Sequence, residues 1–326
     1  MGLRLVLGRA GSGKSKLCQE EIVRELKERP DGYPLIYIVP EQATFQEEYA
    51  LTTAPGLGGT IRAQVLSFRR LAWKVMQEVG GGKRFFIDDT GKGMVLRKVL
   101  EKQRGRLRVF RHAGEQAGAL ENLVQLYNEL KRSCIPVSLL REIFQKRVDA
   151  GGADLPSLFQ EKMSDLLLIL EEAEKELAGL YIDTEDYLNL LAELLPRSVY
   201  ITGAEVWVDG FYGFTNQEYA VLEGLLGRCR GVTVTASLDR FRSSEEVLDE
   251  LDPFYPAALT CRKLQQLADR CRVPLEKVIL GKGFLPRFTG NPELAHLEQK
   301  LHSYPAIPYN GEISCLTLAA APNRRC

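Results

Sequence analysis

The chain has 326 residues, about twice the usual length of one domain, so its length predicts two domains or one domain with a large insertion. Lysine and arginine together number 43, as do aspartate and glutamate, which excludes a protein basic enough to coat nucleic acid by charge alone. With 45% hydrophobic and 26% charged residues, the composition is that of an ordinary globular protein and excludes disordered and fibrous classes.

The cysteines and apolar segments bear on the cellular compartment. The seven cysteines are scattered without a C-x-x-C pair, so neither a zinc ribbon nor a disulfide framework is indicated, and we interpret them as reduced thiols. The apolar run Leu3–Leu7 is interrupted by Arg4 and is too short for a signal peptide, and no stretch approaches the roughly 18 apolar residues of a membrane span. The sequence therefore predicts a cytoplasmic protein without membrane association.

The first seventy residues alternate short apolar runs with helical patterns, as a parallel sheet with crossover helices does. Leu3–Leu7 predicts a strand, and a glycine-rich turn over residues 8–15 follows it. Leu35–Val39 predicts a second buried strand, and the helix between the two completes a β-α-β unit. The apolar face of this helix comprises Cys18, Ile22 and Leu26.

A third strand is predicted at Ala63–Leu66, and Ser67 follows it as the expected cap of a helix. The apolar face of that helix comprises Phe68, Leu71, Ala72, Val75, Met76 and Val79. From about residue 85 to 195 the strand signals vanish and helical patterns replace them. We therefore predict an all-helical insertion over this range.

Strand signals resume at Val206–Asp209 and Val232–Ala236, and the helix between them begins with a capping box, Thr215-x-x-Glu218. The remaining pattern gives a helix near 260–271, a strand at Lys277–Leu280, a helix near 293–302 and a strand at Ile313–Leu318. The sequence thus predicts an α/β fold in which a helical insertion interrupts one parallel sheet. We expect three domain segments: 1–84 plus 196–305 for the α/β domain, 85–195 for the insertion, and 306–326 for the start of a truncated following domain.

Charge is distributed unevenly within the insertion. Residues 83–111 hold ten basic and three acidic residues, whereas residues 154–193 hold eleven acidic and two basic residues. Solvated helix faces could happen to differ in charge, the two segments could pair with each other, or one could face DNA while the other avoids it. The sequence leaves these interpretations open.

Residues 8–15 match the phosphate-binding pattern G-x-x-x-x-G-K-[ST] between a predicted strand and a predicted helix, the context that this motif requires. The motif consists of Gly8, Arg9, Ala10, Gly11, Ser12, Gly13, Lys14 and Ser15. Its glycines let successive backbone N–H groups point at phosphate oxygens, and the helix N-terminus adds a partial positive charge. Lys14 would reach the β- and γ-phosphates and Ser15 would hold Mg²⁺. We therefore predict a site for ATP with Mg²⁺.

An acidic residue should end a buried strand of the same sheet, and Asp209 does so after Val206–Val208. Its carboxylate could hold a water ligand of Mg²⁺ in the nucleotide site, although a strand-end turn residue is the alternative. Hydrolases of this class commonly carry a glutamate at the next position, which is Gly210 here. The sequence therefore predicts nucleotide binding with little hydrolysis, and it identifies no catalytic residue.

Four strings carry a family resemblance along the whole chain: Val39-Pro40-Glu41-Gln42-Ala43-Thr44-Phe45-Gln46, Leu66-Ser67-Phe68-Arg69-Arg70-Leu71-Ala72-Trp73, Tyr181-Ile182-Asp183-Thr184-Glu185-Asp186-Tyr187-Leu188 and Val208-Asp209-Gly210-Phe211-Tyr212-Gly213-Phe214-Thr215. Together with the early phosphate-binding motif, they resemble the AddB proteins of bacterial AddAB helicase-nucleases. The resemblance implies a P-loop, RecA-like domain of the kind found in superfamily 1 helicases, with a helical insertion.

The resemblance also implies a role. Such heterodimers of AddA and AddB bind broken duplex ends, unwind and degrade DNA with ATP, and leave a single strand for recombinational repair after meeting a Chi sequence. AddA is the motor partner, and AddB resembles a decayed motor that reads Chi. This chain would be the N-terminal part of AddB, so the nuclease domain (a 5′–3′ exonuclease), a 4Fe-4S cluster and the second RecA-like domain would lie outside it.

The resemblance further assigns DNA contacts to the loops after the second and third strands. The implied single-stranded DNA and Chi-binding residues are Gln42, Thr44, Phe68, Arg70, Trp73 and Phe211. The helical pattern distinguishes two of these residues, Phe68 and Trp73, by their position relative to the apolar stripe of the helix. Phe68 lies within the apolar stripe of its helix, so core packing explains it equally well, whereas Trp73 falls outside the stripe, where stacking on bases needs an exposed ring.

Two competing function classes remain at this point. A self-contained small-molecule kinase with a helical lid would explain the phosphate-binding motif but not the four strings. A scaffold that has lost nucleotide binding is disfavoured by the intact Lys14 and Ser15.

Overall fold

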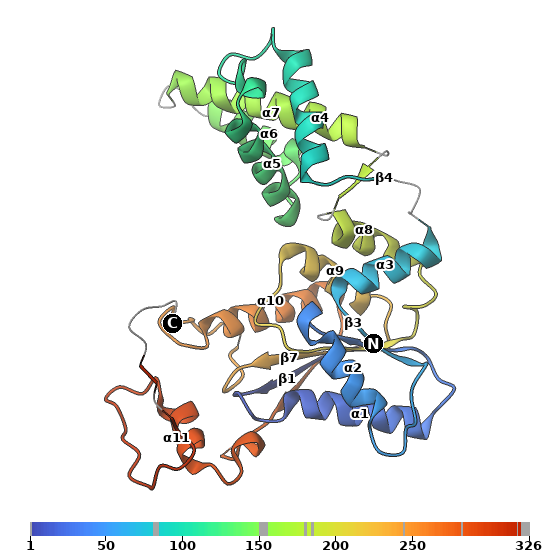
Figure 1. The fold of residues 1–326 in the computed structure, drawn as a ribbon, viewed down its shortest axis with the longest axis vertical. Coiled ribbons are helices and arrows are strands. Elements are labelled where there is room, and N and C mark those ends of the chain that lie inside the picture. The colour runs from blue at the N-terminus through green and yellow to red at the C-terminus, as the bar shows by residue number, and fades with distance from the viewer. Residues whose placement is uncertain are drawn as a thin grey trace. The chain divides into compact units, whose positions relative to one another are not determined.

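The computed structural model describes residues 2–80, 85–149, 156–178, 181–183, 186–243, 245–281, 283–317 and 319–320. The chain forms two compact units (Figure 1). The first comprises Met1–Ser67, Thr202–Gly213 and Leu226–Cys326, and the second comprises Phe68–Ile201 and Phe214–Leu225. The domain boundaries expected from the sequence remain a prediction.

The first unit is built on a six-stranded sheet in which every neighbouring pair is parallel. In spatial order its strands are β3 (Ala63–Leu66), β2 (Leu35–Ile38), β6 (Glu205–Val208), β7 (Gly231–Ser237), β1 (Leu3–Gly8) and β8 (Leu275–Ile279). The predicted α/β class with one parallel sheet is therefore confirmed. Because all strands run the same way, the loops that follow them gather at one edge.

Helices cover both faces of this sheet (Figure 1). They are α1 (Lys14–Glu28) and α2 (Thr44–Thr52) on one face and α10 (Tyr255–Cys271) on the other, with α11 (Pro292–Lys300) near the end of the chain. Cys18 and Ile22 of α1 enter a core with Leu35, Tyr37 and Trp207 of the strands. Strands covered on both faces explain the nearly continuous apolar runs seen in the sequence.

One predicted strand is wrong. Residues 313–317 form no strand, and Leu318 lies outside the described residues. The backbone N–H groups of Ser314 and Cys315 instead donate to the Glu293 carboxylate, at 3.1 and 2.7 Å. The backbone N–H of Glu293 itself and these two bonds hold the pKa of Glu293 down to about 2. Alternating apolar residues form a strand only where another strand offers its backbone, and here a carboxylate takes that place.

The second unit is mainly helical. Its helices are α3 (Phe68–Val79), α4 (Asp89–Gln103), α5 (Ala117–Arg132), α6 (Val137–Asp149), α7 (Ser157–Leu177), α8 (Asp186–Leu194) and α9 (Asn216–Leu226). α4 packs against α5 and α7, α6 packs against α7, and α3 packs against α8. The predicted capping box of α9 is confirmed: the Thr215 N–H donates to the Glu218 carboxylate at 2.7 Å, and the Glu218 N–H donates to the Thr215 hydroxyl at 3.2 Å.

The prediction of an all-helical insertion is also wrong. Phe85–Phe86 (β4) and Tyr181–Ile182 (β5) pair as a parallel two-stranded sheet. These strands lie where the chain enters and leaves the bundle of α4–α7. Strands of two residues are too short to show the alternation on which a sequence-based prediction depends.

The basic and acidic segments of the insertion pair with each other. Lys98 and Lys102 contact Glu176 at 2.6 and 3.4 Å, and Arg108 contacts Glu161 at 2.8 Å. The pairing interpretation is therefore confirmed for these side chains. A DNA-facing role for the basic segment remains a prediction.

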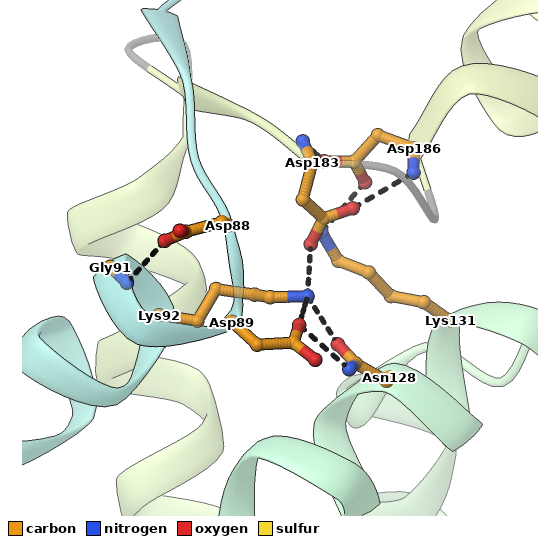
Figure 2. A network of polar contacts seen from close by, with 8 residues as sticks. All are labelled: Asp88, Asp89, Gly91, Lys92, Asn128, Lys131, Asp183 and Asp186. Atoms are coloured by element: carbon orange, nitrogen blue, oxygen red, sulfur yellow. Dashed lines mark hydrogen bonds and ion pairs between the residues drawn. The ribbon is translucent and has the colours of Figure 1, made fainter.

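A buried polar network lies beside β4 and β5 (Figure 2). The Lys92 ammonium of α4 contacts Asp89 at 2.7 Å, Asp183 at 3.3 Å and Asn128 at 2.5 Å. Lys131 of α5 contacts Asp183 at 3.2 Å. Lys92 and Asp183 are each 1% exposed. Burial alone would raise the pKa of Asp183, but the two lysines reverse this and lower it. The network ties the strand that leaves the bundle to two of its helices.

Candidate nucleotide-binding site

The glycine-rich loop over residues 8–15 connects β1 to α1, as its motif predicts. Gly11 and Gly13 have φ angles of +79° and +90°, and Gly13 caps the first turn of α1. This left-handed backbone favours glycine, since other residues adopt it at a cost. The first N–H groups of α1 have no carbonyl of a preceding helical turn to bond to, and Gly13 at the N-cap has no side chain to cap them, which is the arrangement that favours a phosphate.

Lys14 begins α1, and its ammonium returns to the loop. Nζ donates to the Gly8 carbonyl at 2.8 Å and to the Arg9 carbonyl at 3.1 Å. Burial lowers the pKa of Lys14, and the charge of Asp209 opposes that shift. The ammonium is thus held at the loop that an anionic ligand would occupy.

Asp209 follows β6 at the same edge of the sheet and is 4% exposed. Its Oδ2 accepts a hydrogen bond from the Tyr37 hydroxyl at 2.9 Å, and its Oδ1 accepts one from the Thr235 hydroxyl. Burial and this carboxylate raise the pKa of Tyr37, which keeps the phenol as a donor. Asp209 is therefore oriented from the two neighbouring strands, β2 and β7.

The residue after Asp209 has a backbone that disfavours a carboxylate side chain. Gly210 has a φ of +80°, and a Cβ at this position would lie 3.3 Å from Pro40 Cδ. A side chain here would adopt a strained conformation, at a cost of about 1–3 kcal/mol. The turn thus favours glycine at the position where hydrolases of this class commonly carry a glutamate.

The remaining loop residues have distinct environments. Ser12 is buried, and its hydroxyl has no hydrogen-bond partner in the part of the chain that the structure describes. Ala10 and Ser15 are exposed. The Arg9 side chain does not face the loop's amides: its Nε donates to both carboxylate oxygens of Glu298 at 3.0 Å. A buried hydroxyl without a partner, beside free amides and an ammonium, fits an oxygen-rich anion such as a phosphate chain.

The residues with an implied role in DNA binding are divided between the two units. Gln42, Thr44 and Phe211 belong to the first unit, and Phe68, Arg70 and Trp73 belong to the second. Gln42 and Arg70 are exposed, and Phe211 is half-buried. Trp73 is 59% exposed, as its place outside the apolar stripe predicts.

Thr44 and Phe68 have structural contacts. Thr44 is buried at the start of α2, and its hydroxyl donates to the Glu41 carbonyl at 2.9 Å. Phe68 is buried and meets the Phe214 ring edge-on, with 6.3 Å between ring centroids. The core-packing alternative for Phe68 is therefore observed. DNA contacts by all six residues remain predictions.

Several contributors to the site have no signal in the sequence. Tyr37 and Thr235 orient Asp209 across 172 and 26 residues of chain. Glu298 reaches Arg9 across 289 residues. No motif spacing could have paired them, because the order of strands in the sheet brings Tyr37 and Thr235 to Asp209, and the packing of α11 brings Glu298 to Arg9.

Comparison with known proteins gives a consistent family. The family described as "ADDB, N-terminal" matches residues 5–298. The chain is 44% identical over its whole length to a protein of Geobacillus thermodenitrificans that is named as the B subunit of an ATP-dependent helicase/deoxyribonuclease. It is 47% and 46% identical to proteins of the same name from Desulforudis audaxviator and Heliobacterium modesticaldum. The chain spans 26–28% of the length of these relatives.

Within the described ranges, no helix has the length and apolar character needed to cross a membrane.

The family match also bears on the alternative of a small-molecule kinase. That alternative explains the glycine-rich loop alone, whereas the family match extends over residues of both compact units. The chain therefore belongs to the AddB family and corresponds to its N-terminal part.

Proposed function

We propose that this chain is the P-loop, RecA-like nucleotide-binding part of an AddB protein and that it binds ATP with Mg²⁺. The observation that carries the proposal is the convergence of the glycine-rich loop, the Lys14 ammonium and the buried Asp209 carboxylate at one edge of the sheet. Ser15 would hold Mg²⁺, and Asp209 would hold a water ligand of the ion. The metal would neutralise charge on the phosphates.

We further propose that the chain acts within a helicase-nuclease heterodimer with AddA in the cytoplasm. There it would bind single-stranded DNA from a duplex end and read Chi, so that recombinational repair can begin. The relatives' names, which describe one subunit of an ATP-dependent helicase and deoxyribonuclease, support this assignment. The six described cysteines are free thiols, in agreement with a reducing compartment. The nuclease domain and a 4Fe-4S cluster would lie in the remainder of such a protein.

ATP hydrolysis by the chain should be weak, because no carboxylate follows Asp209 to activate water and Gly210 occupies a backbone conformation that disfavours one. We expect steady-state turnover with Mg·ATP and single-stranded DNA to stay far below about 1 per second, the lower end of typical enzyme rates. Phosphate release, measured with and without DNA, tests this. Turnover near that rate that Lys14→Ala abolishes would contradict the proposal.

A further inference from the structure

A turn near the end of the first unit packs directly on the glycine-rich loop. After β8 the chain forms a single 3₁₀ turn, Pro286–Phe288. The Arg287 N–H donates to the Gly11 carbonyl at 3.2 Å. A Cβ added at Gly11 would lie 2.9 Å from Arg287 Cβ and 3.0 Å from the Phe288 ring. The turn is therefore in van der Waals contact with the loop that would hold phosphate.

Contacts on both sides fix this turn in place. Leu285, which precedes it, is buried. Beyond the turn, Glu298 of α11 receives the Arg9 guanidinium at 3.0 Å. The same guanidinium lies over the Phe254 ring, 5.1 Å from its centroid. Burial of Leu285 and the ion pair between Arg9 and Glu298 therefore hold the segments before and after the turn.

The side chain of Arg287 brings an uncompensated charge to this turn. Arg287 is exposed, and no carboxylate pairs with it within the described part of the chain. The contact of its turn with Gly11 places Arg287 beside the loop to which the Lys14 ammonium is bonded. In agreement with this placement, the charge of Arg287 adds to the lowering of the Lys14 pKa, behind the larger effect of burial. Two carboxylates, Asp209 and Glu298, oppose this lowering of the Lys14 pKa. Asp209 accepts hydrogen bonds from Tyr37 and Thr235, and Glu298 accepts them from Arg9, so each already has partners of its own.

Two cations without a dedicated counter-ion, beside a loop of free amides, form a site for a multiply charged anion. Coulomb repulsion between Lys14 and Arg287 would be relieved by a ligand that carries negative charge to both. We propose that Arg287 is a phosphate-binding residue of the nucleotide site and that it contacts the terminal phosphate of a nucleoside triphosphate. This rests on the proposed binding of ATP, which it extends to a residue outside the motif.

The experiment is an equilibrium titration of the chain with Mg·ATP and with Mg·ADP. Arg287→Ala keeps the Cβ that packs on Gly11 and removes only the charged group. We expect it to weaken ATP binding roughly tenfold or more, as loss of a charge-assisted hydrogen bond does, and to weaken ADP binding less. Arg287→Lys should recover part of the ATP affinity because it restores the charge without the planar guanidinium.

Arg24→Ala is the matched control, since Arg24 lies on α1 about 15 Å further along the helix axis than Lys14. It should leave both affinities unchanged. ATP binding by Arg287→Ala within twofold of the parent, tighter than the parent, or weakened equally for ATP and ADP would overturn the inference. If the parent chain itself bound no nucleotide, the proposed function would fail as well. Unchanged urea midpoints confirm that each variant is folded.

Discussion

Replacing Lys92 with methionine should lower the free energy of unfolding of the helical unit by about 3–5 kcal/mol, the range for breaking a buried ion pair. The substitution removes the ammonium that joins Asp89, Asn128 and Asp183 (Figure 2). It leaves the buried Asp183 carboxylate with less compensating charge. Urea unfolding followed by circular dichroism measures the loss.

Lys98→Met is the matched control because Lys98 lies on the same helix and also pairs with a carboxylate, Glu176. Its side chain is 64% exposed, and surface pairs of this kind contribute about 0–1 kcal/mol. We expect a clear difference between the two variants. Equal losses would show that the buried network does not stabilise this unit more than a surface pair does.

The second large effect concerns the response to Chi. In a complete heterodimer with AddA, Gln42→Ala and Trp73→Ala should spare unwinding of Chi-free DNA and abolish the Chi-dependent fragments. Trp73 exposes its ring, and loss of one stacked base costs roughly 1–3 kcal/mol. That is enough to remove a transient pause without releasing the DNA. Processing of linear duplex with and without Chi measures both activities.

Phe159→Ala controls for the loss of an exposed aromatic side chain, since Phe159 is 45% exposed on α7 and has no implied role at Chi. It should leave the Chi response intact. If the Gln42 and Trp73 variants also retained Chi-dependent fragments, then Chi recognition would lie elsewhere. Thr44 is a poorer probe, because its hydroxyl already bonds to the Glu41 carbonyl and its loss would disturb the start of α2.

The sheet was predictable from sequence where strands are buried on both faces. β1 and β2 are mostly apolar runs, and β7 alternates valine with threonine. All three are bounded by glycine, proline or polar residues, so their positions follow from pattern alone. Their order in the sheet does not follow, because β6 inserts between β2 and β7 only through long-range packing. β4 and β5 were missed for a different reason, because strands of two residues are too short to show a pattern.

The candidate site divides in the same way. Residues 8–15 and Asp209 could be named in advance, since a local motif and a strand end identify them. Tyr37 orients Asp209, but the sequence pattern predicts only that it is a buried residue of a strand. Arg287 belongs to no motif, and only the packing of its turn on Gly11 reveals it. Local chemistry was predictable, and the partners supplied by the fold were not.

Nucleotide binding where the glycine-rich loop, Lys14 and Asp209 converge can be measured by calorimetric titration of the chain with Mg·ATP. Lys14→Ala is the comparison, because the Lys14 ammonium reaches the loop carbonyls at 2.8 and 3.1 Å. We expect the parent chain to bind one ATP per chain. The Lys14→Ala variant should show no saturable binding, while an unchanged urea midpoint confirms that it is folded. Absence of binding to the parent chain, or equal affinity in the variant, would contradict the proposed nucleotide site.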